Sequence, residues 1–353
     1  MIWLTLRQFR VQGAVVFGAL AVLGVFLAAT GPGLADDYSS GLASCGTDDA
    51  CAEFAEEFFT DHQVYYGVLI LIVMVLPVLI GLFWGAPLIT RELESGTHRL
   101  VWNQSVTRTR WLAVKLGLIG LAAMAAAALT VRAANWWSEP LDKALADQTS
   151  RMAPLGFVAH GIVPIGYAAF AFALGVAAGV LTRGMLPAMA ITLAVFVGVQ
   201  VAMPLWIRPH LIPPKTATVA ITSENMSRMS LDQGARLMTV ETEAAPGAWT
   251  LTNHTVDASG RKADLPGSLL TGVCAPPPPA PPPPPGAGPP KPPAKGPAEA
   301  CFAEIARLGY KQKVVYQPAE HFWPLQLAET GLFAALALAL SGICFYWTRR
   351  RLS

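Results

Sequence analysis

The sequence predicts an all-α polytopic membrane protein with six transmembrane helices, both termini in the cytoplasm and a small outer insert before the sixth helix. Of its 353 residues, 53% are hydrophobic and only 14% are charged, whereas a soluble domain carries about 25% charged residues. The mean hydropathy is +0.45. Long apolar runs predict the helices, and an uneven distribution of Lys and Arg predicts their orientation.

Six runs are long and apolar enough to cross hydrocarbon, which takes about 20 helical residues. Because unpaired backbone groups are costly in lipid, each run should be a helix. The predicted spans are 11–31, 64–88, 115–134, 155–181, 185–207 and 327–347. Glu329 lies about one turn inside the last span and is interpreted as an interfacial residue. With almost no other charge inside the spans, an ion-coupled antiporter is not favoured.

The first span differs from a secretory signal. Arg7 and Arg10 precede it, and residues 33–35 have the small side chains of a weak cleavage site. The apolar run is longer than the 7–15 residues usual for a signal core, so an uncleaved helix is expected.

The orientation follows from the basic residues of the short loops. Segment 32–63 has eight acidic residues and no Lys or Arg, whereas 89–115 has five basic residues. A cytoplasmic amino terminus puts eleven basic residues of the short segments inside and three outside. Segment 208–326 is left out of this count because long loops cross largely regardless of charge.

The cysteines give an independent indication of the outer side. Cys45 and Cys51 share the first outer loop, and Cys274 and Cys301 share the outer insert, while Cys344 stands alone in the last span. Pairs confined to outer segments are typical of disulfides formed in an oxidising compartment. Free thiols remain the alternative, because connectivity cannot be derived from sequence.

Three regions are expected along the chain: the first five spans (1–207), an outer insert (208–326) and the last span with its basic tail (327–353). Within the insert, short strands are predicted at 216–222, 235–240 and 249–256. Segment 275–297 holds fourteen prolines and is interpreted as a stiff extended spacer.

The 175–179 stretch has the small-xxx-small spacing that lets helices approach closely. Gly175 and Gly179 are therefore expected to pack against a neighbouring helix of the same chain, rather than to form a dimer seam.

No catalytic or cofactor motif is present. The chain lacks a Gly-rich phosphate loop ending in Gly-Lys-Ser/Thr and a Gly-x-Ser-x-Gly nucleophile motif. Its six histidines do not have metal-ligand spacing. A net charge of +2 without a dense basic patch gives no reason to expect a nucleic-acid partner. No catalytic residue, metal or cofactor is predicted.

The charged segment between the second and third spans, TRELESGTHRLVWNQSVTRTRWLAVK (90–115), is the candidate binding element. Residues 91–96 are predicted to continue the helix until Gly96 stops it, and Thr107 is predicted to cap the next helix. A loop that only fixes orientation explains the arginines but not Glu92, Glu94 and Trp102, because acidic residues contribute little to orientation. Docking onto a soluble protein would explain them.

This segment resembles the matching cytoplasmic segment of type-2 ATP-binding-cassette (ABC) exporter permeases, especially the actinobacterial group. In that family an acidic-x-acidic-x-Gly-Thr element precedes a Ser/Thr-Arg element. Here those positions are Glu92, Glu94, Gly96, Thr97, Ser105, Thr107 and Arg108. The closing YQPAEHFWPLQLAETGLFAALALALSG (316–342) resembles the final helix of the group and its approach.

The resemblance implies a multi-pass permease of the bacterial plasma membrane. Its partners would be cytoplasmic ABC ATPase subunits, a second permease copy or a paralogue, and the lipid bilayer. The amino-terminal MIWLTLRQFRVQ would be an interfacial elbow helix. The implied coupling residues are Arg91, Glu92, Glu94, Gly96, Thr97, His98, Trp102, Ser105, Thr107 and Arg108.

Two functions remain open from the sequence. One is export of an apolar or amphiphilic substrate, driven by a separate ATPase. The other is a non-transporting sensor or scaffold whose disulfide-stapled outer insert binds a ligand.

Overall fold

The computed structural model describes residues 2–94, 107–145, 150–232, 237–266, 269, 274 and 296–350. These residues form two compact units. The helical unit comprises Met1–Ile212 and Glu320–Ser353, and the insert unit comprises Pro213–Ala319.

Six apolar helices of the helical unit are long enough to cross a membrane, which confirms the predicted number of spans. They are α1 (Ile2–Ser44), α2 (Asp48–Ile80), α5 (Arg108–Ala144), α7 (Val163–Thr182), α8 (Met185–Ala202) and α11 (Phe322–Arg350). A π-helical turn, Gly81–Gly85, joins α2 to the short helix α3 (Pro87–Glu94). A second one, Met203–Ile207, joins α8 to α9 (Arg208–Leu211).

One predicted boundary was wrong. The fourth span begins at Val163 and not at 155, because residues Pro154–Ala159 form a separate short helix, α6. The break follows at Gly161, whose φ of +101° is open to glycine and strained for other residues. The residues expected to form an interfacial elbow helix are the first turns of α1, and their interfacial place stays a prediction.

Helix α7 is the centre of the helical unit, because 78% of its most apolar stretch of 18 residues is buried. Its glycines permit close packing: a Cβ on Gly175 would stand 2.3 Å from the carbonyl oxygen of Gly81, and one on Gly179 would stand 2.9 Å from that of Ala86. Both predicted packing glycines therefore face the chain's own second span, where only a hydrogen fits.

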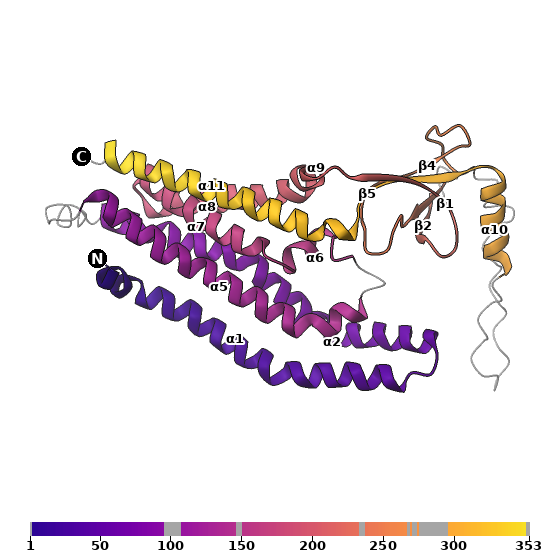
Figure 1. Ribbon diagram of the computed structural model, residues 1–353, viewed down its shortest axis with the longest axis horizontal. Coiled ribbons are helices and arrows are strands. Elements are labelled where there is room, and N and C mark those ends of the chain that lie inside the picture. Colours follow the sequence, from indigo (N-terminus) through magenta and orange to yellow (C-terminus); the bar gives the residue numbers. More distant parts are fainter. Residues whose placement is uncertain are drawn as a thin grey trace. The chain divides into compact units, whose positions relative to one another are not determined.

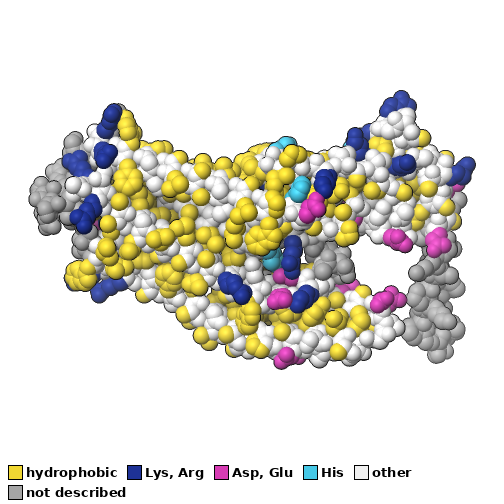
Figure 2. Space-filling view, in the orientation of Figure 1, with side chains coloured by type: hydrophobic (Ala, Val, Ile, Leu, Met, Phe, Trp, Pro, Cys, Tyr) yellow, Lys and Arg dark blue, Asp and Glu magenta, His cyan; other side chains and the backbone are white. Residues whose placement is uncertain are grey.

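Both termini lie at the same end of the helical unit (Figure 1). Helix α3 ends and α8 begins at this end too, since Glu94 of α3 contacts the backbone of Met185. Figure 2 shows hydrophobic side chains over most of the visible face of the unit, with Lys and Arg near both of its ends. We call the end with both termini the terminal end; the opposite end carries α6 and α9 (Figure 1).

The insert unit contains two antiparallel sheets. Strands β1 (Lys215–Ala220), β5 (Lys311–Gln317) and β4 (Trp249–Val256) pair in the order β1-β5-β4. Strands β2 (Met226–Asp232) and β3 (Leu237–Thr242) pair with each other. Helix α10 (Gly296–Arg307) contributes Phe302 and Ile305 to the core of the unit. The predicted strands at 216–222, 235–240 and 249–256 correspond to β1, β3 and β4.

Both predicted disulfides are present. Cys45 pairs with Cys51 between α1 and α2, and Cys274 pairs with Cys301 of α10 in the insert unit. Cys344 is a buried free thiol of α11. The proline-rich tract lies almost wholly outside the described residues.

Candidate functional site

Helix α3 places the acidic residues of the candidate binding element. Pro87, at its start, fits a first helical turn because it has no N–H to leave unpaired. Ile89, Thr90 and Glu92 are buried, whereas Arg91 and Glu94 are exposed. The helix thus presents one charged face outward and packs the other against the bundle.

Glu92 lies in a buried polar cluster that joins three helices. Its carboxylate accepts a short hydrogen bond from the Lys115 ammonium of α5. It also accepts one from the Gln8 side chain of α1 at 3.0 Å. A buried carboxylate is costly unless it is paired in this way. Glu92 is therefore not available as a surface contact, and any part it has in docking is to hold α3 in place.

Glu94 ties the end of α3 to the start of α8. Its Oε1 accepts a hydrogen bond of 2.8 Å from the backbone N–H of Met185. The first N–H groups of a helix have no partner within the helix, and the positive end of the helix dipole favours an anion there. The end of α3 and the start of α8 are therefore in direct contact.

The start of α5 is capped as predicted. Thr107 has extended backbone angles, and its hydroxyl oxygen accepts a hydrogen bond of 3.3 Å from the N–H of Arg110. Arg108 is half-buried at the first turn, and Lys115 follows about two turns later. Gly96, Thr97, His98, Trp102 and Ser105 lie outside the described residues.

A cavity of about 180 Å³ adjoins the Glu92–Lys115 pair. Gln8 and Gln12 of α1 and Arg91 of α3 line it together with the pair itself. A polar cavity of this size has room for water. The ion pair at this end is thus buried but has polar space beside it.

A second buried ion pair, at the opposite end, was missed by the sequence analysis. Arg208 of α9 and Glu329 of α11 are both 0% exposed. Two hydrogen bonds join them, from Nε to Oε2 at 2.8 Å and from Nη2 to Oε1 at 3.1 Å. Glu329 also accepts a short hydrogen bond from the Tyr167 hydroxyl of α7, and Arg208 stacks 4.1 Å from the Phe157 ring centre.

Glu329 is thus a buried, paired side chain and not a surface side chain of the last span, whereas its predicted interfacial depth stays a prediction. The two residues stand on either side of the insert, one just before the chain leaves the helical unit and one just after it returns. That symmetric position was the signal that the sequence offered.

A third polar cluster gathers around Asp142 near the end of α5. Its carboxylate accepts hydrogen bonds from the Tyr66 hydroxyl at 2.9 Å and from Ser138 at 3.1 Å. His160, which follows α6, contacts it through Nε2 at 2.9 Å. Burial opposes the charged imidazole, but the hydrogen bond and the negative charge of Asp142 outweigh this and raise the pKa of His160.

Gln326 of α11 fixes the break between α6 and α7. Its Oε1 accepts hydrogen bonds from the N–H groups of Ile162 and Val163, each at 3.0 Å. Its Nε2 donates to the carbonyls of Phe157 and His160 at 2.7 and 2.8 Å. One buried side chain thus satisfies four backbone groups that the break leaves open.

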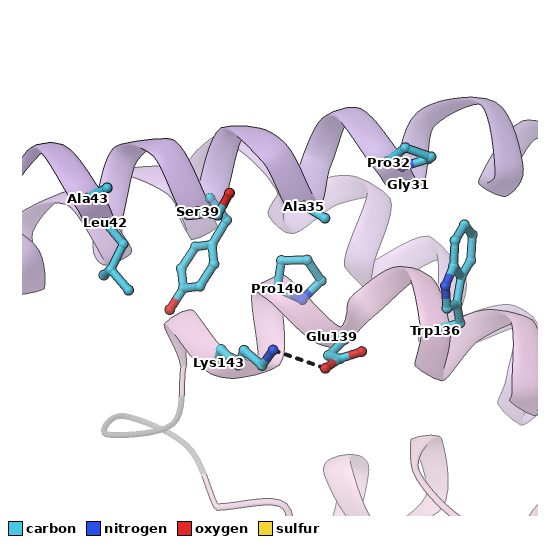
Figure 3. A pocket seen from close by; sticks show the side chains of 11 residues that line it. Gly31, Pro32, Ala35, Ser39, Leu42, Ala43, Trp136, Glu139, Pro140 and Lys143 are labelled. Carbon is cyan, nitrogen blue, oxygen red and sulfur yellow. Dashed lines mark ion pairs between the residues drawn. The ribbon is translucent and has the colours of Figure 1, made fainter.

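Two cavities lie near the end of the helical unit opposite the terminal end. One, of about 770 Å³, separates α1 from α5. In Figure 3, Ala35 and Leu42 of α1 lie across from Trp136 and Pro140 of α5. The other, of about 650 Å³, lies between α2, α5 and α6. No cluster of three or more metal-ligating side chains occurs among the residues that the structure describes.

A comparison with protein families identifies the helical unit. The model of the ABC-2 membrane transporter related family matches residues 17–208, from within α1 to the first residue of α9. The chain belongs to this family. No curated protein and no solved structure matches the chain.

Membership, with six apolar helices, makes the chain a multi-pass membrane protein of the ABC-2 permease type. Such permeases are membrane subunits of transporters and are not themselves catalytic. The family implies partnership with ABC ATPases. The matched segment contains α3, the Glu92–Lys115 pair and the start of α5, whereas the insert unit and α11 lie beyond it.

Proposed function

We propose that this chain is the permease of an ATP-driven exporter of the actinobacterial group, located in a bacterial plasma membrane. It moves an apolar or amphiphilic substrate outward, with energy from a cytoplasmic ABC ATPase made by another chain. The family match over residues 17–208 is the observation that carries the proposal. The sequence has no nucleotide-binding motif of its own, which is consistent with a separate motor.

The coupling element is the terminal end of the bundle around α3. Glu92 connects α3 to α1 through Gln8 and to α5 through Lys115, and Glu94 connects it to α8. A push on α3 is therefore passed to three other helices at once. The exposed Arg91 and the half-buried Arg108 offer charge to the ATPase, and the segment between Glu94 and Thr107 completes the contact.

The exporter contains two permeases and two ATPases, and the second permease is either another copy of this chain or a paralogue. The terminal end faces the cytoplasm, as the concentration of basic residues in its segments predicts. The alternative function, a sensor or scaffold, has no comparable support, because the family match covers the bundle and not the insert unit.

The test is co-purification of the ATPase with the full chain in mild detergent. Glu94→Lys places a cation on the exposed end of α3 and removes the cap of α8; ATPase recovery should fall several-fold. Glu304→Lys, a charge reversal at an exposed ion pair of the insert unit, should leave it unchanged. Glu92→Lys is unsuitable because it would bury two cations together and impair folding.

Equal recovery with both variants would contradict the coupling role of α3. If the wild-type chain never retains an ABC ATPase co-expressed from adjacent genes, the exporter function itself fails.

A further inference from the structure

The cavity between α2, α5 and α6 has the size and the lining of a binding site. Its volume of about 650 Å³ falls within the range of small-molecule sites, about 300–1,000 Å³. Most of its lining residues are apolar, and four are charged or polar: Asp142, Ser150, Arg151 and His160. That combination is typical of sites that take a ligand with an apolar body and one polar end.

The apolar wall of the cavity runs along one face of α2. Phe59, Tyr66 and Ile70 of α2 line it, and their spacing of seven and four residues puts them on one helix face. At 1.5 Å per residue this face is about 16 Å long. Leu155 of α6, 62% exposed, stands at the rim. A wall of this shape suits a hydrocarbon chain better than a compact ring.

The lining includes one arginine, Arg151, together with the carboxylate of Asp142. The Asp142 carboxylate is engaged by the Tyr66 and Ser138 hydroxyls and by His160 Nε2. Arg151 also lines the cavity, and its guanidinium lies close enough to Tyr66 and His160 for its charge to act on both. With the described part of the chain, Arg151 forms no ion pair.

The larger cavity between α1 and α5 lacks this selectivity. Its charged lining residues are Glu139 and Lys143, which pair with each other at 3.0 Å (Figure 3). A neutral pair gives no preference for a charged ligand. The smaller cavity is therefore the one whose lining specifies a ligand class.

We propose that the cavity between α2, α5 and α6 binds an anionic lipid of the bilayer, an acyl chain that ends in a negatively charged group. The anionic group binds Arg151, and the chain lies along the face formed by Phe59, Tyr66 and Ile70. Both α2 and α5 are candidate membrane spans, so bilayer lipid is the apolar phase in contact with them. The site does not depend on the proposed export function, because binding is measured on the chain alone.

The experiment compares two spin-labelled probes in the full chain reconstituted in phosphatidylcholine. One is doxyl-stearic acid, at a pH where its carboxylate is ionised, and the other is its uncharged methyl ester. The motionally restricted fraction of each label reports the lipid held by the protein. A charge-assisted contact at a partly exposed arginine should favour the acid roughly three- to tenfold.

Arg151→Gln should abolish this preference for the acid. Arg132→Gln, at an exposed arginine of α5 that does not line the cavity, should retain it. Leu155→Trp, which fills the rim, should reduce binding of the acid in a chain that elutes as the wild type does. Equal binding of the acid and the ester by the wild type would overturn the proposal, as would an unchanged preference in Arg151→Gln.

Discussion

The two buried ion pairs of the helical unit have similar chemistry but different surroundings. Arg208 and Glu329 form two hydrogen bonds with each other and have no exposed surface. Tyr167 of α7 also donates to Glu329, and Phe157 of α6 stacks on Arg208. Lys115 and Glu92 form one contact, keep 4% and 10% of their side chains exposed and adjoin a polar cavity. A planar guanidinium fixes its partner in one geometry, whereas an ammonium is a point charge on a flexible stem.

The difference suggests a division of roles. The arginine pair joins α9, with which the chain leaves the helical unit, to α11, with which it returns. The lysine pair joins α3 to α5 beside a cavity, and its ammonium is carried on a flexible stem. We therefore expect damage to the first pair to affect stability most, and damage to the second to affect coupling most.

The largest effect is expected from Arg208→Leu. It leaves the carboxylate of Glu329 buried without its cation, and breaking such a pair costs about 3–5 kcal/mol. Thermal unfolding of the purified chain should show a marked loss of stability. Arg132→Leu, at an exposed arginine, is the control and should unfold as the wild type does.

The double variant Arg208→Leu/Glu329→Leu separates charge from packing. It removes both ions, so it should be more stable than Arg208→Leu alone. If the double variant is less stable than the single one, the charge of Glu329 is not the cause of the loss.

Lys115→Met should have a smaller effect on stability, of order 2 kcal/mol, because Gln8 still donates to Glu92 and the adjoining cavity has room for water. The proposed coupling should suffer more. In the reconstituted complex, ATP hydrolysis should continue while substrate movement falls several-fold. Loss of stability as large as that of Arg208→Leu, with transport intact, would reverse the comparison between the two pairs.

The Asp142–His160 contact predicts a pH dependence. The folded state raises the pKa of His160 above its ordinary value of about 6.5, with Asp142, Tyr66 and Arg151 facing the imidazole. Its contribution to stability is therefore complete below pH 6.5 or so and is lost as the pH rises through the raised pKa. The midpoint of thermal unfolding should decrease over this range in the wild type and change less in His160→Gln.

The smallest effect is expected at the cap of α5. Thr107→Val removes the hydroxyl that accepts from Arg110 and should cost about 1 kcal/mol, whereas Thr107→Ser keeps it. Hydrogen exchange of the first turn of α5 is the suitable measurement. Equal protection in the two variants would show that the cap does not order the segment.

The sequence predicts the bundle well because its information is local. Hydropathy predicts six spans, and Thr107 predicts the start of α5 because threonine is a favoured N-cap residue. Strand β5 is missed because two of its buried positions are Gln312 and Gln317, which do not look like core residues. In the structure Gln312 is paired with the carbonyl of Val240, which is distant in sequence.

The polar pairs could not be predicted for the same reason. Glu92 looks like a surface residue until Lys115 and Gln8 are brought to it, and Glu329 looks interfacial until Arg208 reaches it. Pairing across 121 residues depends on how the insert returns the chain to the bundle. The positions of Arg208 and Glu329 on either side of the insert hint at a pair, but only the tertiary structure shows that it forms.

The central claim is that the terminal end of the bundle, at α3, receives the ATPase. The most direct measurement is photocrosslinking in native membranes with a reactive amino acid at the exposed Arg91 of α3, or at the exposed Glu139 near the far end of α5. The account predicts a crosslink to an ABC ATPase subunit from position 91 and none from position 139. A crosslink from position 139, or none from position 91 while the ATPase is present and active, would contradict it.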